Sequence, residues 1–145
     1  MKVPRPRWLP VVVAVLATVL AANASLAQGE TTIACRPPLK PAVSVELYFG
    51  RSKPDGGEVS DGEWEDFLVT EVTPRFPDGL SVADVTGQYR GSSGRAVIER
   101  SKHLHVVVFD APTHLARIAE IIDLYRRRFR QESVLRTERS LCAAL

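Results

Sequence analysis

The chain has 145 residues, of which 45% are hydrophobic and 25% are charged, and it contains two cysteines. This length and composition allow one small domain and exclude a multidomain enzyme, a low-complexity chain and a protein with many membrane spans. The formal net charge of +2 suggests a basic protein, but three of the cations lie in an N-terminal segment with the pattern of an export signal.

The first 27 residues have the order of a secretory signal peptide. Three basic residues precede an uncharged apolar run at residues 11–22, and small residues follow it. The run is shorter than the roughly 20 residues that span a bilayer. We therefore expect cleavage after Ala27, or after Ala24, and not an uncleaved N-terminal anchor.

Loss of this segment changes the charge of the protein. It removes three basic residues and no acidic ones, so the remaining chain has a net charge of −1. A chain without a cationic excess is not expected to bind nucleic acid. Export predicts a periplasmic or secreted protein, with no stable membrane insertion once the signal is cleaved.

The two cysteines, Cys35 and Cys142, lie near the two ends of the exported chain. Disulfides persist in oxidising compartments, so the sequence predicts a bridge between them that closes a loop of about 100 residues. The alternative is a lipid anchor at Cys35, because residues 32–35 weakly resemble a lipobox. The number and spacing of the cysteines exclude a CxxC redox motif and a cysteine-ligated zinc site.

The first half of the exported chain predicts a strand and a helix. Three prolines within residues 28–42 indicate an extended leader, and residues 43–145 form the single domain. Apolar and polar residues alternate over residues 43–50, as in a half-buried strand. A capping-box pattern that begins at Ser60 predicts a helix that Pro74 ends.

The second half predicts two strands, a helix and a final strand. Residues 80–90 and 95–110 form a pair of strands around a Gly-Ser-Ser-Gly turn, Pro112 begins the second helix, and residues 131–141 form the last strand. The order β-α-β-β-α-β predicts an α+β, ferredoxin-like fold, with two helices on one face of a four-stranded antiparallel sheet. In that plan the last strand pairs with the first, which brings the two cysteines to one end of the sheet.

Several segments between residues 43 and 142 carry recognisable motifs. They are Glu46-Leu47-Tyr48-Phe49-Gly50, Val72-Thr73-Pro74-Arg75-Phe76-Pro77-Asp78-Gly79-Leu80, Gly87-Gln88-Tyr89-Arg90, Ser101-Lys102 and Gln131-Glu132-Ser133-Val134-Leu135-Arg136. Together they resemble an uncharacterised family of exported bacterial proteins, a domain of unknown function marked by a Thr-Pro-Arg-Phe-Pro-Asp-Gly-Leu motif. The resemblance implies no activity, cofactor or catalytic residue.

The marker motif carries two charged residues, Arg75 and Asp78. They could form a charged rim with Arg136 and bind a carboxylate or a phosphate. The alternative is structural, because Phe76 suits the core and Pro77-Asp78-Gly79 has the composition of a turn.

The alternation of the strands places Glu46, Tyr48, His103 and His105 on the sheet face that the helices leave open. These four residues are weak candidates for acid-base catalysis. Two imidazoles and one carboxylate do not make a convincing zinc site, so we expect no metal and no cofactor, and surface or interface histidines are the simpler interpretation. A mixed apolar and polar face is typical of a ligand cavity or of a homodimer interface.

Four arginines cluster at the end of the second predicted helix: Arg126, Arg127, Arg128 and Arg130. Cations there complement the negative end of the helix dipole. Docking to anionic lipid headgroups is the alternative.

The sequence favours a non-enzymatic exported module that binds a small ligand or an envelope protein through its open sheet face. No pairing of a nucleophile with a base, and no complete metal set, is evident. The alternative is a small enzyme of the dimeric ferredoxin-like type with acid-base chemistry on that face. A structural role in the envelope is a third interpretation.

Overall fold

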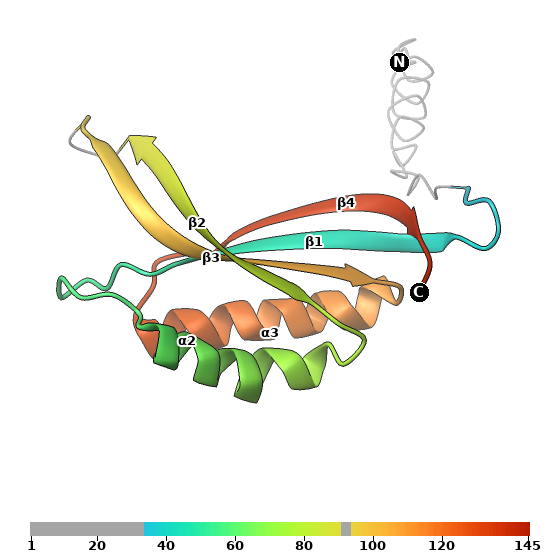
Figure 1. Ribbon diagram of the computed structural model, residues 1–145, viewed down its shortest axis with the longest axis horizontal. Coiled ribbons are helices and arrows are strands. Elements are labelled where there is room, and N and C mark those ends of the chain that lie inside the picture. Colours follow the sequence, from blue (N-terminus) through green and yellow to red (C-terminus); the bar gives the residue numbers. More distant parts are fainter. Residues whose placement is uncertain (1–33, 91–93) are drawn as a thin grey trace, which may run out of the picture. The chain divides into compact units, whose positions relative to one another are not determined.

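A computed structural model describes residues 34–90 and 94–145. In this part of the chain, four strands form one antiparallel sheet and two helices pack against it (Figure 1). The elements are β1 (Lys40–Gly50), α2 (Asp61–Phe67), β2 (Ser81–Arg90), β3 (Ala96–Val108), α3 (Ala111–Phe129) and β4 (Leu135–Ala143). The predicted α+β class, antiparallel sheet and pair of helices are confirmed. The expected signal peptide lies outside the described residues.

The strand order is β2-β3-β1-β4, so the last strand pairs with the first, as expected. Two strand boundaries were predicted wrongly. β1 begins before residue 43 and includes Pro41, which a strand tolerates there because β1 pairs with β4 alone until its ladder with β3 begins at Val43. β4 begins at Leu135 and not at residue 131, because α3 extends to Phe129 and the residue that caps it, Arg130, adopts the left-handed conformation with φ of 53°.

The first helix does not end at Pro74. It continues from α2 as a π-helical turn, Leu68–Val72, and a 3₁₀ turn, Thr73–Arg75. A proline fits the first turn of a helical segment, where its missing N–H group has no partner to lose. The predicted capping box at the other end is confirmed, since the Ser60 hydroxyl accepts a hydrogen bond from the Glu63 amide at 3.2 Å and the Glu63 carboxylate accepts one from the Ser60 amide at 2.8 Å.

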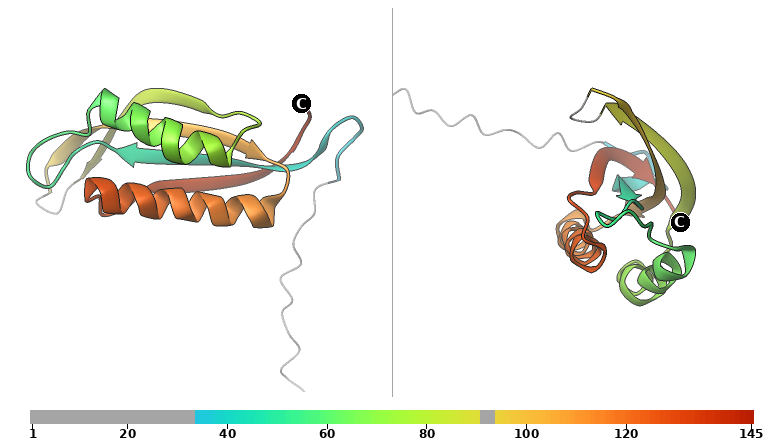
Figure 2. Two further views of the ribbon diagram at one scale, coloured as in Figure 1. Left: turned by 90° about the horizontal axis from the view of Figure 1, so that it is seen from below. Right: turned by 90° about the vertical axis from the view of Figure 1, so that its left-hand side faces the viewer.

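Both helices cover the same face of the sheet (Figure 2). The alternate residues of β1 that point toward them, Val45, Leu47 and Phe49, are completely buried. The Phe49 ring contacts Tyr125 of α3, with 4.7 Å between the ring centroids, and Phe67 of α2 at 6.1 Å. An aromatic cluster therefore joins both helices to the sheet.

The loop that follows β1 is fixed by Arg51, whose side chain is buried. Its Nε donates to the Val59 carbonyl at 2.7 Å, and the Val59 amide donates to the Arg51 carbonyl at 2.8 Å. Arg51 and the buried Lys102 share the carboxylates of Asp61 and Asp84, with Lys102 Nζ at 3.0 and 2.6 Å from them. Burial would lower the pKa of Lys102, but the hydrogen bonds to Asp84 and Asp61 outweigh it and raise the pKa.

A disulfide joins Cys35 to Cys142 across 107 residues of sequence. Cys142 pairs with Pro41 at the start of β1, so the bridge lies where the ends of β1 and β4 meet. The sulfur of Cys35 is therefore not available for the lipid anchor considered as the alternative. No helix among the described residues is long and apolar enough to cross a membrane.

The ribbon of β2 and β3 extends past the rest of the sheet. The ladder between β1 and β3 ends at Gly50 and Ser101, whereas the ladder between β2 and β3 continues to Arg90 and Ala96. Figure 1 shows this ribbon bending away from the helices. The open face of the sheet is therefore concave where β1 ends and the ribbon continues.

Candidate functional site

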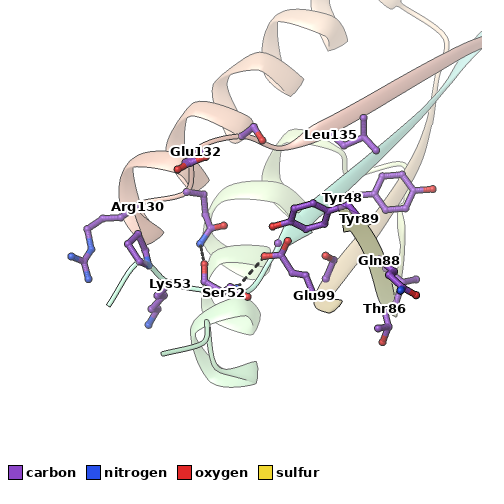
Figure 3. A pocket seen from close by; sticks show the side chains of 17 residues that line it. Tyr48, Ser52, Lys53, Thr86, Gln88, Tyr89, Glu99, Arg130, Glu132 and Leu135 are labelled. Carbon is purple, nitrogen blue, oxygen red and sulfur yellow. Dashed lines mark hydrogen bonds between the residues drawn. The ribbon is translucent and has the colours of Figure 1, made fainter. Parts of the chain in front are cut away.

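The concave end of the open sheet face contains a cleft with a volume of about 730 Å³. Three segments that are distant in sequence form it: the end of β1 with the following loop, the β2–β3 ribbon, and residues 130–135 between α3 and β4 (Figure 3). Gln131 connects two of these walls, because its Nε2 donates to the Ser52 carbonyl at 2.7 Å.

Aromatic and aliphatic side chains line part of the cleft. Tyr48 of β1 is half-buried, while Tyr89 of β2 is 55% exposed and Leu135 of β4 is 61% exposed. Tyr48 and Leu135 are partners in the β1–β4 ladder, so their side chains are neighbours on the open face. The cleft thus presents apolar surface to solvent, whereas the opposite face of β1 is buried by the helices.

Glu99 of β3 lies on the floor of the cleft between two glycines. Gly87 is its direct partner across the β2–β3 ladder. On the other side, a Cβ atom at Gly50 would come within 2.7 Å of Glu99 Oε1, so the carboxylate occupies the space above that glycine. The Ser52 amide donates to Oε1 at 3.4 Å. Within residues 34–90 and 94–145, no ion pair neutralises Glu99.

The cations at the rim of the cleft already have acidic partners outside its lining. Lys53 Nζ lies 2.9 Å from Glu63 Oε1, and the Arg130 guanidinium pairs with Asp55. Hydrogen bonds from Lys53 and Ser60 lower the pKa of Glu63 to about 2. Lys53 and Arg130 therefore form their ion pairs with residues other than Glu99.

The predicted group of Glu46, Tyr48, His103 and His105 does converge on the open face. The Tyr48 hydroxyl donates to Glu46 Oε2 at 2.9 Å, and its ring stacks on His103 with centroids 4.6 Å apart. His103 Nε2 lies 3.4 Å from the same Glu46 oxygen, and His105 Nε2 is 2.8 Å from the Ser44 hydroxyl. Glu46, His103 and His105 line a smaller hollow of about 260 Å³ beside the main cleft.

The hydrogen bond between Tyr48 and Glu46 perturbs both groups. It is the largest cause that lowers the pKa of the Glu46 carboxyl, and His103 and His105 act in the same direction. The same bond raises the pKa of Tyr48 above its ordinary value. Glu46 is therefore a carboxylate and Tyr48 a phenol at neutral pH, and this arrangement can accept a proton at Glu46 or hold a polar ligand. The part of the chain that the structure describes contains no group of three His, Cys, Asp or Glu residues able to hold a metal ion.

The structure does not bring Arg75, Asp78 and Arg136 together. Arg75 pairs with Glu71 at 3.1 Å and with Glu120 at 3.4 Å. Asp78 lies in the connection to β2, whereas Arg136 lies on β4. β2 and β4 are opposite edges of the sheet, so the expected charged rim does not form.

The arginines at the end of α3 mostly have acidic partners. Arg126 Nη1 lies 3.6 Å from Asp123 Oδ1, and Arg128 Nη2 lies 2.5 Å from Asp66 Oδ2. Arg130 pairs with Asp55, as described above. These contacts are side-chain ion pairs within the domain, so the role at the helix dipole and docking to lipid both stay predictions.

The sequence did not identify Glu99, Tyr89 or Leu135 as site residues. Tyr89 and Leu135 do lie in segments that carry the family resemblance, and so do the flanking glycines, Gly50 and Gly87. Their presence in those segments was the sequence signal that could have indicated a shared site. Glu99 lies outside those segments, and its place in the cleft depends on the curvature of the ribbon.

Comparisons with known proteins agree with this fold. The model of a family described as a protein of unknown function (DUF3574) matches residues 44–145, so the chain belongs to that family. A phage SAM lyase in complex with S-methyl-5'-thioadenosine is similar in structure, with a TM-score of 0.55, 16% identity and coverage of 72% of this chain and 90% of that chain. A phage SAM lyase in the apo state gives a TM-score of 0.52, 16% identity and coverage of 78% and 96%. No curated protein matches the chain.

Proposed function

We propose that this member of the DUF3574 family is an exported, non-enzymatic module that binds a small ligand in the cleft of its open sheet face. The cleft itself is the observation that supports the proposal most strongly. Its volume of about 730 Å³ lies within the range of about 300–1,000 Å³ that is usual for small-molecule sites. Exposed apolar side chains beside a few polar groups are also typical of such sites.

The proposed location follows from the disulfide and the N-terminal sequence. A bridge between Cys35 and Cys142 suits the periplasm or the extracellular medium, where disulfides persist. The basic, apolar and small-residue order of residues 1–27 supports export by the secretory route. A sheet in which β4 pairs with β1 also supports the ferredoxin-like plan.

The similar solved structures suggest ligands to test first. A phage SAM lyase binds S-methyl-5'-thioadenosine, a molecule with a flat ring and hydroxyl groups. Tyrosine rings such as Tyr48 and Tyr89 can stack on a flat ring. Gln88 and Ser101, which also line the cleft, can exchange hydrogen bonds with hydroxyl groups.

Amide NMR of the oxidised protein, titrated with S-methyl-5'-thioadenosine and a panel of nucleosides and small aromatic metabolites, tests this function. A ligand should shift the amides of the three cleft segments, and Tyr89→Ala and Leu135→Ala should weaken its binding. Val69→Ala is the matched control, because Val69 is 58% exposed and lies outside the cleft lining. Equal weakening by the control, or a dimer that buries Tyr89 and Leu135 and leaves no cleft, would contradict the proposal.

A second candidate function is acid-base catalysis beside the cleft. It is favoured by the Glu46 carboxylate, which lies 3.4 Å from His103 Nε2 and accepts a hydrogen bond from a cleft tyrosine. Incubation with S-adenosylmethionine, followed by chromatography for S-methyl-5'-thioadenosine, tests a lyase activity like that of the similar structures. Glu46→Gln should abolish such turnover and spare binding, since an amide oxygen still accepts from Tyr48.

A further inference from the structure

We propose that the ligand of the cleft is a small organic cation whose charged head lies against Glu99, between the levels of Tyr48 and Tyr89. This inference rests on the proposed binding function and adds the chemical class of the ligand. It follows from the charge, the backbone shape and the aromatic surfaces around Glu99.

Glu99 is a half-buried carboxylate that lacks a cationic partner among the described residues. Lys53 and Arg130, the two cations in the cleft lining, are paired with Glu63 and Asp55. The contact of Glu99 with the Ser52 amide is long, at 3.4 Å. The floor of the cleft is therefore negative, which attracts a cation and repels an anionic ligand.

Two glycines, which carry no side chains, lie next to this carboxylate. A side chain at Gly50 would collide with Glu99 Oε1 at 2.7 Å. A Cβ atom at Gly87 would have one neighbour within 4 Å, the Glu99 carbonyl oxygen, at 3.9 Å. The carboxylate therefore fills the space above Gly50, whereas no side chain projects from Gly87, and a compact head group can approach from that side.

Two aromatic rings flank this space along the strands. Tyr48 lies level with His103 of β3 and Tyr89 lies level with Val97, so Glu99 is between them on the same face. Figure 3 shows Glu99, Tyr48 and Tyr89 among the side chains that line the cleft. The Tyr48 ring is held by its hydrogen bond to Glu46 and by stacking on His103. A carboxylate with electron-rich rings on either side is the chemistry that recognises ammonium and sulfonium groups.

Calorimetric titration and amide NMR with three probes test the ligand class. The probes are choline, trimethylsulfonium and 3,3-dimethylbutan-1-ol, which is the neutral isostere of choline. Choline or trimethylsulfonium should shift the cleft amides, and the isostere should bind about tenfold more weakly than choline if the charge is recognised. A preference between the two cations distinguishes an ammonium ligand from a sulfonium ligand.

Glu99→Gln should reduce cation binding by about tenfold and remove the preference over the isostere. Glu65→Gln, at an exposed position of α2 outside the cleft, makes the same change in net charge and should leave binding unchanged. Gly50→Ala should also weaken binding by displacing Glu99, and circular dichroism shows whether that variant folds.

Three results would overturn the inference: equal binding of choline and its isostere, full cation binding by Glu99→Gln, or cleft shifts with neutral nucleosides and none with cations. The third result would leave the proposed binding function intact. If neither cations nor neutral compounds shift the cleft amides, both the ligand class and the binding function are wrong.

Discussion

Side chains alternate between the two faces of the sheet, but the apolar side chains of the two faces differ in how far they are buried. On the covered face, Leu47 and Phe49 are completely buried by the helices, whereas Tyr89 and Leu135 on the open face are more than half exposed. The helices thus bury the side chains of β1 on the covered face. The open face leaves apolar surface in contact with water, and a bound ligand is the explanation that we favour.

The charged residues of the two faces differ in the same way. Arg51 and Lys102, on the helix side, share the carboxylates of Asp61 and Asp84. Glu99, on the open side, has no such partner within the described ranges. Internal pairing therefore indicates a structural role, and an unpaired half-buried charge in a cleft indicates a binding role.

The largest expected effect on stability concerns the disulfide, which joins the ends of β1 and β4 and so belongs to neither face alone. Cys35→Ser combined with Cys142→Ser should lower the free energy of unfolding by about 4 to 5 kcal/mol, because the bridge closes a loop of about 100 residues. Denaturation with guanidinium, monitored by circular dichroism, measures this loss. An unchanged midpoint would show that the bridge does not constrain the unfolded chain.

A matched pair of leucines tests the contrast between the faces directly. Leu47→Ala should destabilise the protein by about 3 kcal/mol, because it leaves a cavity in the core. Leu135→Ala should change the stability by less than about 0.5 kcal/mol, since its side chain is mostly exposed, while it weakens ligand binding. Urea denaturation of both variants checks the comparison, and equal losses of stability would contradict it.

Removal of a buried cation on the covered face should have an intermediate effect. Arg51→Met leaves the Val59 carbonyl without the hydrogen bond from Nε, which should lower the free energy of unfolding by about 1 to 3 kcal/mol. Arg127→Met is a control, because Arg127 is exposed on α3. Thermal denaturation of the two variants should show a loss confined to Arg51.

The smallest effect concerns Glu63, which links the helix cap to the rim of the cleft through Lys53. The pKa of its carboxyl is about 2 in the folded protein, against a usual value of 4.5. Its stabilisation is therefore present above pH 4.5 and is lost as the pH falls toward 2. The free energy of unfolding should fall over this interval in the wild type and less steeply in Glu63→Gln, and parallel curves would contradict the assignment.

The alternation of residues in β1 and β3 was enough to predict which side chains share a face. That is why the convergence of Glu46, Tyr48, His103 and His105 could be expected before the structure. Strand ends were harder to place, because the start of β1 depends on where its ladder with β3 begins and the start of β4 on the left-handed conformation of Arg130.

The cleft itself could not be predicted from local patterns. It depends on the bend of the β2–β3 ribbon and on the approach of residues 130–135 to the end of β1, both of which arise from long-range packing. The prediction of a charged rim formed by Arg75, Asp78 and Arg136 was wrong for the same reason. Charge and turn composition suggested that these residues act together, but the strand order places Asp78 and Arg136 at opposite edges.

The position of the disulfide has a practical consequence for handling the protein. The bridge lies at the Pro41–Cys142 end of the ladder between β1 and β4, and the cleft begins at the other end of β1, near Tyr48 and Gly50. At roughly 3.3 Å per residue, the strand separates the two by about 25 Å. A linker attached beside either cysteine would therefore hold the domain on a sensor surface or bead with its cleft directed outward.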